Sequence, residues 1–130
     1  MLRTLISAAS LLWLGTSPSV AQLQKENCQT QGFNFQLYEN SKVDYESYMD
    51  QNGCRYTFTS SGYDMTPRVI EKSVVMKSPQ NGTLTQDGAF SFFYKPKPGF
   101  KGKDNFVIYV CGTHRNSAAC ARLNYNATIR

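Results

Sequence analysis

The sequence has 130 residues, with 14 Lys and Arg against 9 Asp and Glu and a formal net charge of +5 at pH 7. A chain of this length forms one ordinary domain, which excludes a multidomain enzyme. Because 41% of the residues are hydrophobic, 13% aromatic and only 18% charged, the composition is typical of a folded globular chain and not of a disordered one.

The N-terminal segment has the pattern of a Sec-type signal peptide. Arg3 supplies a positive charge, residues 5–14 are an apolar run of ten, and small residues lead up to Ala21. A helix of ten residues is about 15 Å long, half the thickness of a hydrocarbon core, so this run is too short for a membrane anchor. We expect a signal peptide at 1–21 and a secreted or periplasmic mature domain, residues 22–130, with no membrane span.

The mature chain is predicted to be all-β. Apolar and polar residues alternate in short segments between turn residues, and no segment keeps a helical period over the length of a stable helix. Asp87-Gly88 predicts a tight hairpin turn, whereas the polar stretch 40–53 has no assignment. Several short strands separated by turn residues predict two packed antiparallel sheets, a β-sandwich. In chain order the expected strands are 32–38, 54–59, 69–77, 83–85, 89–95, 105–110 and 121–129.

Four cysteines in an exported chain predict two disulfide bonds, because thiols oxidise and stay oxidised outside the cytoplasm. They are Cys28, Cys54, Cys111 and Cys120. A zinc site is not expected, since the spacing contains no C-x2-C pair and His114 is the only histidine. All four cysteines are therefore expected to be half-cystines.

The alternation of the last two strands favours one pairing of these cysteines. Their apolar residues share one face, which places Cys111 and Cys120 on the other face and opposite each other if the strands form a hairpin. Cys28 then pairs with Cys54. The alternative, Cys54 with Cys111, would imitate the inter-sheet bridge of immunoglobulin domains and requires a β-bulge to turn Cys111 inward. Spacing alone leaves both pairings open.

Residues 78–110 carry an extended motif of glycines, prolines and aromatic residues. It runs P-x-x-G-T-x-T and then, after a short hairpin, Y-x-P-x-P-G-F-x-G-x-D-x-F. The segment resembles the repeat of bacterial immunoglobulin-like and cadherin-like domains. This resemblance implies an immunoglobulin-like or cadherin-like two-sheet antiparallel β-sandwich, in which the motif marks the fold and not an active site. The matching residues are Pro79, Gly82, Thr83, Tyr94, Pro96, Pro98, Gly99, Phe100, Gly102, Asp104, Phe106 and Tyr109.

The motif residues also have expected structural roles. Pro98-Gly99 predicts a type II turn, since Pro fixes φ at the first central position and Gly adopts positive φ at the second. Phe100 is expected to fold back over the end of the sandwich. Asp104 is expected to accept hydrogen bonds from backbone N–H groups of the same loop. Cadherin-like domains that bind calcium use clustered acidic residues, whereas Asp104 is isolated, so calcium-dependent adhesion is not expected.

The sequence favours a non-catalytic protein without a metal or cofactor. Its single imidazole, His114, lies between two expected half-cystines, and bridged cysteines cannot act as nucleophiles. The acids Asp44, Glu46 and Asp50 lie in a polar stretch, where such spacing is more typical of a solvated segment than of a catalytic carboxylate pair. No glycine-rich phosphate loop is present.

Charge is distributed unevenly and indicates a candidate ligand patch. Residues 22–67 hold three basic and six acidic residues, whereas residues 68–130 hold ten basic and three acidic residues. The residues of the patch are clustered around one turn, where they are suited to an anionic cell-envelope glycan or another exported protein. The alternative is a solvated surface in which lysines prevent edge aggregation. The patch consists of Lys95, Lys97, Phe100, Lys101 and Lys103.

Two functions from different classes follow. The first is an exported, non-catalytic binding or structural module of the bacterial periplasm or cell surface, with an unidentified ligand. The second is a small secreted inhibitor in which the loop 112–119 enters a cleft of a partner protein, with His114 and Arg115 at the tip of the loop. Nucleic acid is not an expected partner of an exported chain.

Overall fold

Strands and their connections, without a helix, make up the residues that the computed structural model describes, which are 27–32, 35–38, 41–58 and 69–130. The predicted all-β fold is confirmed. The expected signal peptide and domain start lie outside the described residues. No helix in the described part is long and apolar enough to cross a membrane. The strands are β1 (Gln29–Gln31), β2 (Ser41–Met49), β3 (Cys54–Thr57), β4 (Val69–Lys77), β5 (Gly82–Gly88), β6 (Ser91–Pro96), β7 (Gly102–His114) and β8 (Ser117–Ile129).

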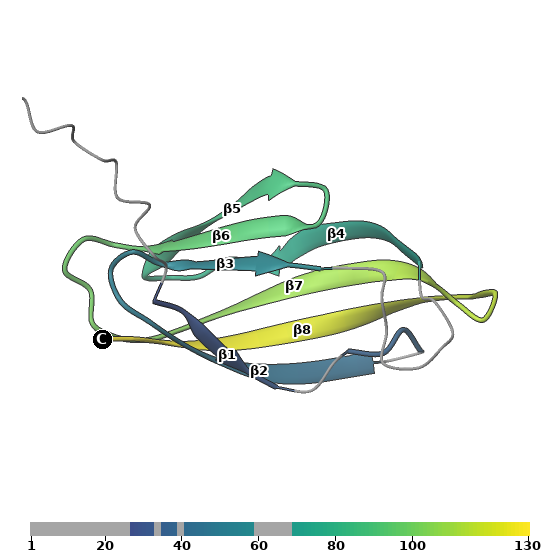
Figure 1. The fold of residues 1–130 in the computed structure, drawn as a ribbon, viewed down its shortest axis with the longest axis horizontal. Coiled ribbons are helices and arrows are strands. Elements are labelled where there is room, and N and C mark those ends of the chain that lie inside the picture. The colour runs from purple at the N-terminus through teal and green to yellow at the C-terminus, as the bar shows by residue number, and fades with distance from the viewer. Residues whose placement is uncertain (1–26, 33–34, 39–40, 59–68) are drawn as a thin grey trace, which may run out of the picture.

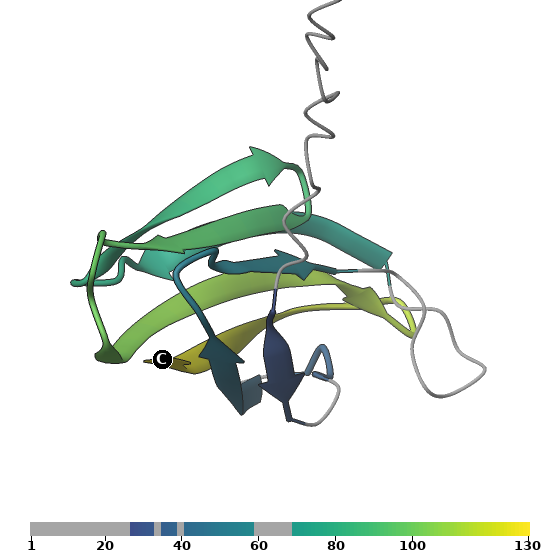
Figure 2. The ribbon, with the colours of Figure 1, turned by 60° about the vertical axis from the view of Figure 1, so that its left-hand side comes forward.

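The strands form two facing sheets (Figures 1 and 2). One sheet has the order β1-β2-β8-β7-β4, and the other has the order β3-β6-β5. Neighbouring strands are antiparallel except for β2 and β8, which are parallel. The expectation of purely antiparallel sheets is therefore wrong for this pair. The C-terminal end of β8 lies at the same end of the molecule as the β6–β7 loop, and the β7–β8 turn lies at the opposite end (Figure 1).

The two longest strands, β7 and β8, pair in the register that their alternation predicts. Phe106 lies opposite Tyr125, and Cys111 lies opposite Cys120. Every second residue from 104 to 110 is buried, and the residues between them are only partly buried. The period of two in the sequence therefore corresponds directly to the inner and outer faces of this sheet.

The turn between β7 and β8 corrects one expectation. Its residues Arg115 and Asn116 have φ values of 51° and 62°, as a two-residue hairpin turn of type I′ requires. Strand pairing continues up to His114 and Ser117. The loop expected at 112–119 is thus wrong, because all but these two turn residues belong to the hairpin ladder.

Aromatic side chains from both sheets form the centre of the core. The ring of Phe106 lies 5.4 Å from the ring of Tyr94 on β6, 5.4 Å from that of Tyr56 on β3 and 5.2 Å from that of Tyr125 on β8. All four side chains are buried. Burial raises the pKa of Tyr56 to about 12 and also raises the pKa of Tyr94 and of Tyr125. These ring contacts join the two sheets.

We expect the core to unfold cooperatively at alkaline pH. A phenol whose folded-state pKa lies above its ordinary value of 10 contributes its full stability below pH 10 and loses it as the pH rises toward 12. Each such tyrosine then costs up to about 1.4 kcal/mol per pH unit. In a pH titration, absorbance of the buried tyrosinates should rise together with the loss of the far-UV circular dichroism signal. Complete ionisation near pH 10 with an unchanged dichroism signal would contradict this expectation.

Strand β2 occupies the polar stretch 40–53 that the alternation left unassigned. Its inward face contains two buried serines, Ser41 and Ser47, which are 2% and 0% exposed. Serines at inward positions interrupt the apolar alternation that marks a strand in a sequence. The long parallel pairing with β8, from Ser41 opposite Ala121 to Met49 opposite Ile129, supplies the order that the local sequence does not indicate.

The strand expected at 32–38 is wrong in the described residues. Strand β1 ends at Gln31, and residues 33–34 lie outside the described part. Phe35 and Leu37 are buried at 4% and 3% exposure but do not belong to a strand. The alternation of Phe35 and Leu37 with polar residues therefore arises because their side chains pack against the core, and not because the segment pairs with a neighbouring strand.

The hairpin between β5 and β6 is present, but its turn is displaced. The strands pair up to Gly88 opposite Ser91, with a register shift after Gln86. The turn consists of Ala89 and Phe90. The expected turn at Asp87-Gly88 is thus wrong by two residues, because this dipeptide forms the irregular end of β5.

Both favoured disulfides are present, and the described part contains no free cysteine. Cys28 precedes β1 and is bonded to Cys54 of β3, so this bond ties the two sheets together. Cys111 and Cys120 join β7 to β8 on the outer face of the five-stranded sheet. The alternative pairing of Cys54 with Cys111 is not formed.

Candidate binding surface

The expected type II turn at Pro98-Gly99 shapes the β6–β7 loop. Gly99 has a φ of 78°, and the N–H of Phe100 donates to the carbonyl oxygen of Lys97 over 3.0 Å. Both observations fit the prediction that Pro and Gly take the two central positions of a type II turn. The turn places lysines on both sides of one compact loop.

Gln51, in the connection between β2 and β3, holds this loop in place. Its side-chain Nε2 donates to the carbonyl oxygen of Phe100 over 2.6 Å, and its Oε1 accepts from the N–H of Gly99 over 3.0 Å. The ammonium group of Lys95 donates to the backbone oxygen of Gln51 over 2.8 Å. A loop fixed in this way loses little conformational entropy when it binds a ligand.

The five residues of the predicted patch divide into two roles. Phe100 is half-buried and packs against the core, which agrees with its expected place over the end of the sheets and makes it a structural residue. Lys97, Lys101 and Lys103 are exposed, and their ammonium groups make no hydrogen bond or ion pair in the described part of the chain. These three lysines and Lys95 are called the lysine loop below.

Asp104 links the lysine loop to the connection between β4 and β5. Its carboxylate accepts hydrogen bonds from the backbone N–H groups of Gln80, Asn81 and Asn105 at 2.9–3.0 Å and from the hydroxyl of Tyr94 at 2.8 Å. The prediction that the donors come from its own loop is wrong: two of the four come from the β4–β5 connection.

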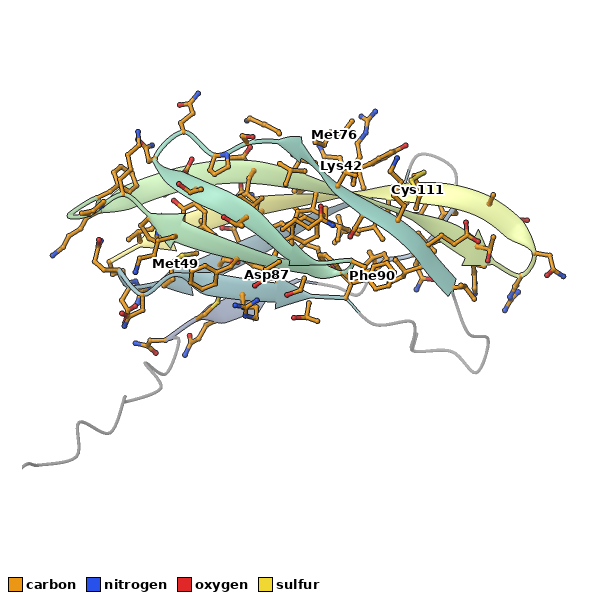
Figure 3. All side chains as sticks on the ribbon, turned by 90° about the horizontal axis from the view of Figure 1, so that it is seen from above. Lys42, Met49, Met76, Asp87, Phe90 and Cys111 are labelled. Carbon is orange, nitrogen blue, oxygen red and sulfur yellow. A yellow bond between two sulfur atoms is a disulfide. The ribbon has the colours of Figure 1, made fainter. Side chains whose placement is uncertain are left out.

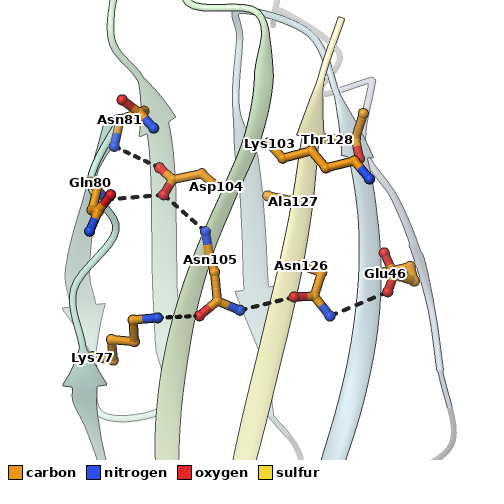
Figure 4. A pocket seen from close by; sticks show the side chains of 10 residues that line it. All are labelled: Glu46, Lys77, Gln80, Asn81, Lys103, Asp104, Asn105, Asn126, Ala127 and Thr128. Carbon is orange, nitrogen blue, oxygen red and sulfur yellow. Dashed lines mark hydrogen bonds between the residues drawn. The ribbon is translucent and has the colours of Figure 1, made fainter.

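A polar groove of about 380 Å³ lies beside Asp104, where β4 has ended and the chain crosses to the other sheet (Figure 4). Eight of its lining residues have charged or amide side chains. Lys103 lines the groove, so the groove and the lysine loop form one continuous surface. The lining residues are Glu46, Lys77, Gln80, Asn81, Lys103, Asp104, Asn105, Asn126, Ala127 and Thr128.

A row of hydrogen bonds crosses four strands at the floor of the groove (Figure 4). The Lys77 ammonium donates to Oδ1 of Asn105 over 2.7 Å, Nδ2 of Asn105 donates to Oδ1 of Asn126 over 3.0 Å, and Nδ2 of Asn126 donates to Oε1 of Glu46 over 3.3 Å. Each side chain in the row fixes the next. The side chains of the floor are therefore held in place by one another.

The rim of the groove offers polar groups that the described part of the chain does not use. They are the Lys103 ammonium, the Thr128 hydroxyl and the side-chain amides of Gln80 and Asn81. Hydroxyl and amide groups beside lysines suit a ligand that carries both hydroxyls and carboxylates or sulfates. Within the described residues, no cluster of three His, Cys, Asp or Glu side chains is placed to hold a metal ion.

The acids considered for catalysis have structural partners. Asp44 accepts from Nδ2 of Asn124 over 2.7 Å, Glu46 accepts from Asn126, and Asp50 accepts from the N–H of Asn52 over 2.8 Å. His114 lies on β7 beside the turn and is half-buried. None of these side chains belongs to the lysine loop.

The sequence predicted the lysines of this surface but not the groove. Lys77, Asn105 and Asn126 come from three different strands, and only their pairing brings them together. The sequence does place Asn105, Asn124 and Asn126 at outward-facing positions of their strands. Once the register of β7 and β8 is known, these positions predict a cluster of amide side chains.

Neither a protein-family model nor a curated protein sequence matches this chain.

Proposed function

We propose that this protein is an exported, non-catalytic immunoglobulin-like binding module of the bacterial periplasm or cell surface, and that it binds an anionic glycan of the cell envelope through the lysine loop and the adjoining groove. The observation that carries the proposal is a group of three exposed ammonium groups, in and directly after a loop that Gln51 holds in place, which have no hydrogen-bond or ion-pair partner among the described residues. An acidic polymer is the partner that such a surface favours electrostatically.

The strand order supports an immunoglobulin-like sandwich. In that fold, the second, fifth and fourth strands lie side by side in one sheet, and the third, sixth and seventh in the other. When β2 is counted as the first of the seven strands, β3-β6-β5 and β4-β7-β8 have this order. Strand β2 itself pairs with the last strand, β8. The motif in 78–110 agrees. The disulfides differ from the immunoglobulin pattern. Cys54 is bonded to Cys28, which precedes the edge strand β1, and not to a cysteine on a central strand of the opposite sheet.

Export is supported by the signal-peptide pattern at 1–21 and by the two disulfide bonds. Disulfides persist in oxidising compartments and are rare in the cytosol. A small all-β domain that meets proteases and variable salt outside the cytoplasm gains stability from such bonds.

Charge reversal in the lysine loop tests the glycan proposal. We expect Lys101→Glu/Lys103→Glu to weaken binding to immobilised heparin or polygalacturonate by about tenfold or more, seen as elution at lower salt. Lys72→Glu/Arg115→Glu changes the net charge equally at other positions and should elute close to the wild type. Equal losses for the two variants would show that net charge, and not this surface, governs retention.

The control variant also tests the inhibitor hypothesis. Arg115 lies in the β7–β8 turn, so capture of an exported partner that is lost with the control variant and kept with the lysine-loop variant would favour an inhibitor. The strand pairing at both sides of this turn leaves only a two-residue tip to enter a cleft, which gives the inhibitor less support.

A further inference from the structure

A second basic site lies on the outer face of the five-stranded sheet, away from the lysine loop. Lys42 of β2 is paired directly opposite Arg122 of β8, and Arg122 is paired opposite Tyr109 of β7. Tyr109 is six residues along β7 from Lys103, a distance of about 20 Å in an extended strand. Figure 3 labels Lys42, and also Cys111, whose disulfide borders this site.

The side chains around this site form a depression of about 420 Å³. Its charged lining residues are Lys42 and Arg122, its aromatic residue is Tyr109, and the small residues Ala118 and Ala119 leave the space open. Both cations are exposed. In contrast to the groove at Asn105, this depression has no acidic residue among its described lining residues.

The pairing of Lys42 with Arg122 brings two like charges together, and no ion pair among the described residues relieves their repulsion. Like charges directly opposite each other on a sheet are destabilising, and neither cation forms an ion pair in the described part of the chain. Asp44, two residues from Lys42 on the same face, is hydrogen-bonded to Asn124 and forms no ion pair with either cation. Two adjacent cations without an ion-pair partner among the described residues are suited to receive an anion between them.

Ser41 borders the depression at the first position of β2, but its hydroxyl does not face it. The residue is only 2% exposed and lies on the inward face of the strand, whereas Lys42 and Arg122 are exposed on the outer face. The polar side-chain groups that an anion in the depression can reach are therefore the Lys42 ammonium, the Arg122 guanidinium and the Tyr109 hydroxyl.

We infer that the depression between Lys42 and Arg122 is an oxyanion-binding site, which takes a sulfate, phosphate or carboxylate group. Arg122 presents a planar fork of N–H donors to two oxygens of the anion, Lys42 adds a second positive charge, and the Tyr109 hydroxyl is a further donor at the rim. The site is separate from the proposed glycan surface, and either can be present without the other.

Thermal unfolding of the full mature chain tests this inference with two effects of opposite sign. Without an added anion, Lys42→Glu should raise the melting temperature by about 1–5 °C, because a like-charge pair becomes an opposite-charge pair with Arg122. Sodium sulfate should raise the melting temperature of the wild type more than sodium chloride of equal ionic strength. The variant should lose this sulfate-specific increase while keeping the general salt effect.

Two further measurements locate the anion and identify its source. NMR titration with sulfate should shift the amide signals of Tyr109, Cys120 and Arg122, and Arg122→Lys should weaken sulfate binding about five- to tenfold through loss of the bidentate contact. Parallel titrations with phosphate and galacturonate identify the source of the anion. Tighter binding of phosphate indicates an inorganic anion, and tighter binding of galacturonate indicates the carboxylate of a sugar.

The inference is overturned if Lys42→Glu lowers the melting temperature, or if the variant keeps the full sulfate response. These outcomes do not affect the glycan proposal. Lys101→Glu/Lys103→Glu should keep the sulfate response and lose glycan retention, whereas Lys42→Glu should lose the sulfate response and keep most of the retention. Loss of both properties in both variants would show one diffuse basic surface and would reject a separate site.

Discussion

Replacing Asp104 with alanine is expected to lower the free energy of unfolding by about 3–5 kcal/mol, because the substitution leaves several buried donors without their acceptor. The carboxylate is 8% exposed and accepts four hydrogen bonds, from Gln80, Asn81, Tyr94 and Asn105. Urea denaturation followed by tyrosine fluorescence measures the loss.

The size of this effect follows from the donors that the substitution leaves behind. The Tyr94 hydroxyl is buried, and the N–H groups of Gln80 and Asn81 have no other acceptor among the residues that the structure describes. A buried donor without a partner costs about 1–3 kcal/mol. Since the donors come from three segments, the loss should also loosen the wall of the groove beside Lys103.

Two variants provide controls for the Asp104 prediction. Tyr94→Phe removes one donor and keeps the carboxylate with its three backbone partners, so its loss should be about 1–2 kcal/mol. Asp87→Ala removes a carboxylate of the same type from the exposed ion pair with Arg55, where solvent screens the interaction and the loss should be much smaller. Equal losses for Asp104→Ala and Asp87→Ala would show that the buried network contributes little.

The parts of the fold that were predictable from the sequence are those in which local alternation and pairing agree. The register of β7 and β8 follows from the parity of Phe106 and Cys111 relative to Cys120, and the disulfide pattern follows from that register. A slip of one residue would expose the whole apolar face of each strand. The sequence therefore tolerates only one arrangement of these two strands.

The parts that were not predictable depend on contacts between distant segments. Strand β2 has serines on its inward face, and its order comes from the parallel pairing with β8. Asp104 receives donors from a connection more than twenty residues earlier in the chain. The groove needs Lys77, Asn105 and Asn126 from three strands. Local propensity contains no information about such long-range pairing.

Removing the Cys28–Cys54 disulfide is expected to destabilise the protein more than removing the Cys111–Cys120 disulfide. The two bonds close segments with sequence separations of 26 and 9 residues. On the chain-entropy model these loops correspond to about 3–4 and about 2–3 kcal/mol, because a longer loop restricts the unfolded chain more. Calorimetry of Cys28→Ala/Cys54→Ala and Cys111→Ala/Cys120→Ala measures both.

The architecture strengthens this difference. Cys111 and Cys120 lie within a hairpin ladder that continues on both sides of the bond, from Gly102 opposite Ile129 to His114 opposite Ser117, so the strands stay paired without it. The Cys28–Cys54 bond instead ties the three-residue strand β1, exposed at all of its positions, to the opposite sheet. Limited proteolysis should therefore cleave near residues 27–32 only in the Cys28→Ala/Cys54→Ala variant. Faster cleavage there in the other variant, or an equal loss of stability in both, would mean that the hairpin bond and not the inter-sheet bond limits the stability of the fold.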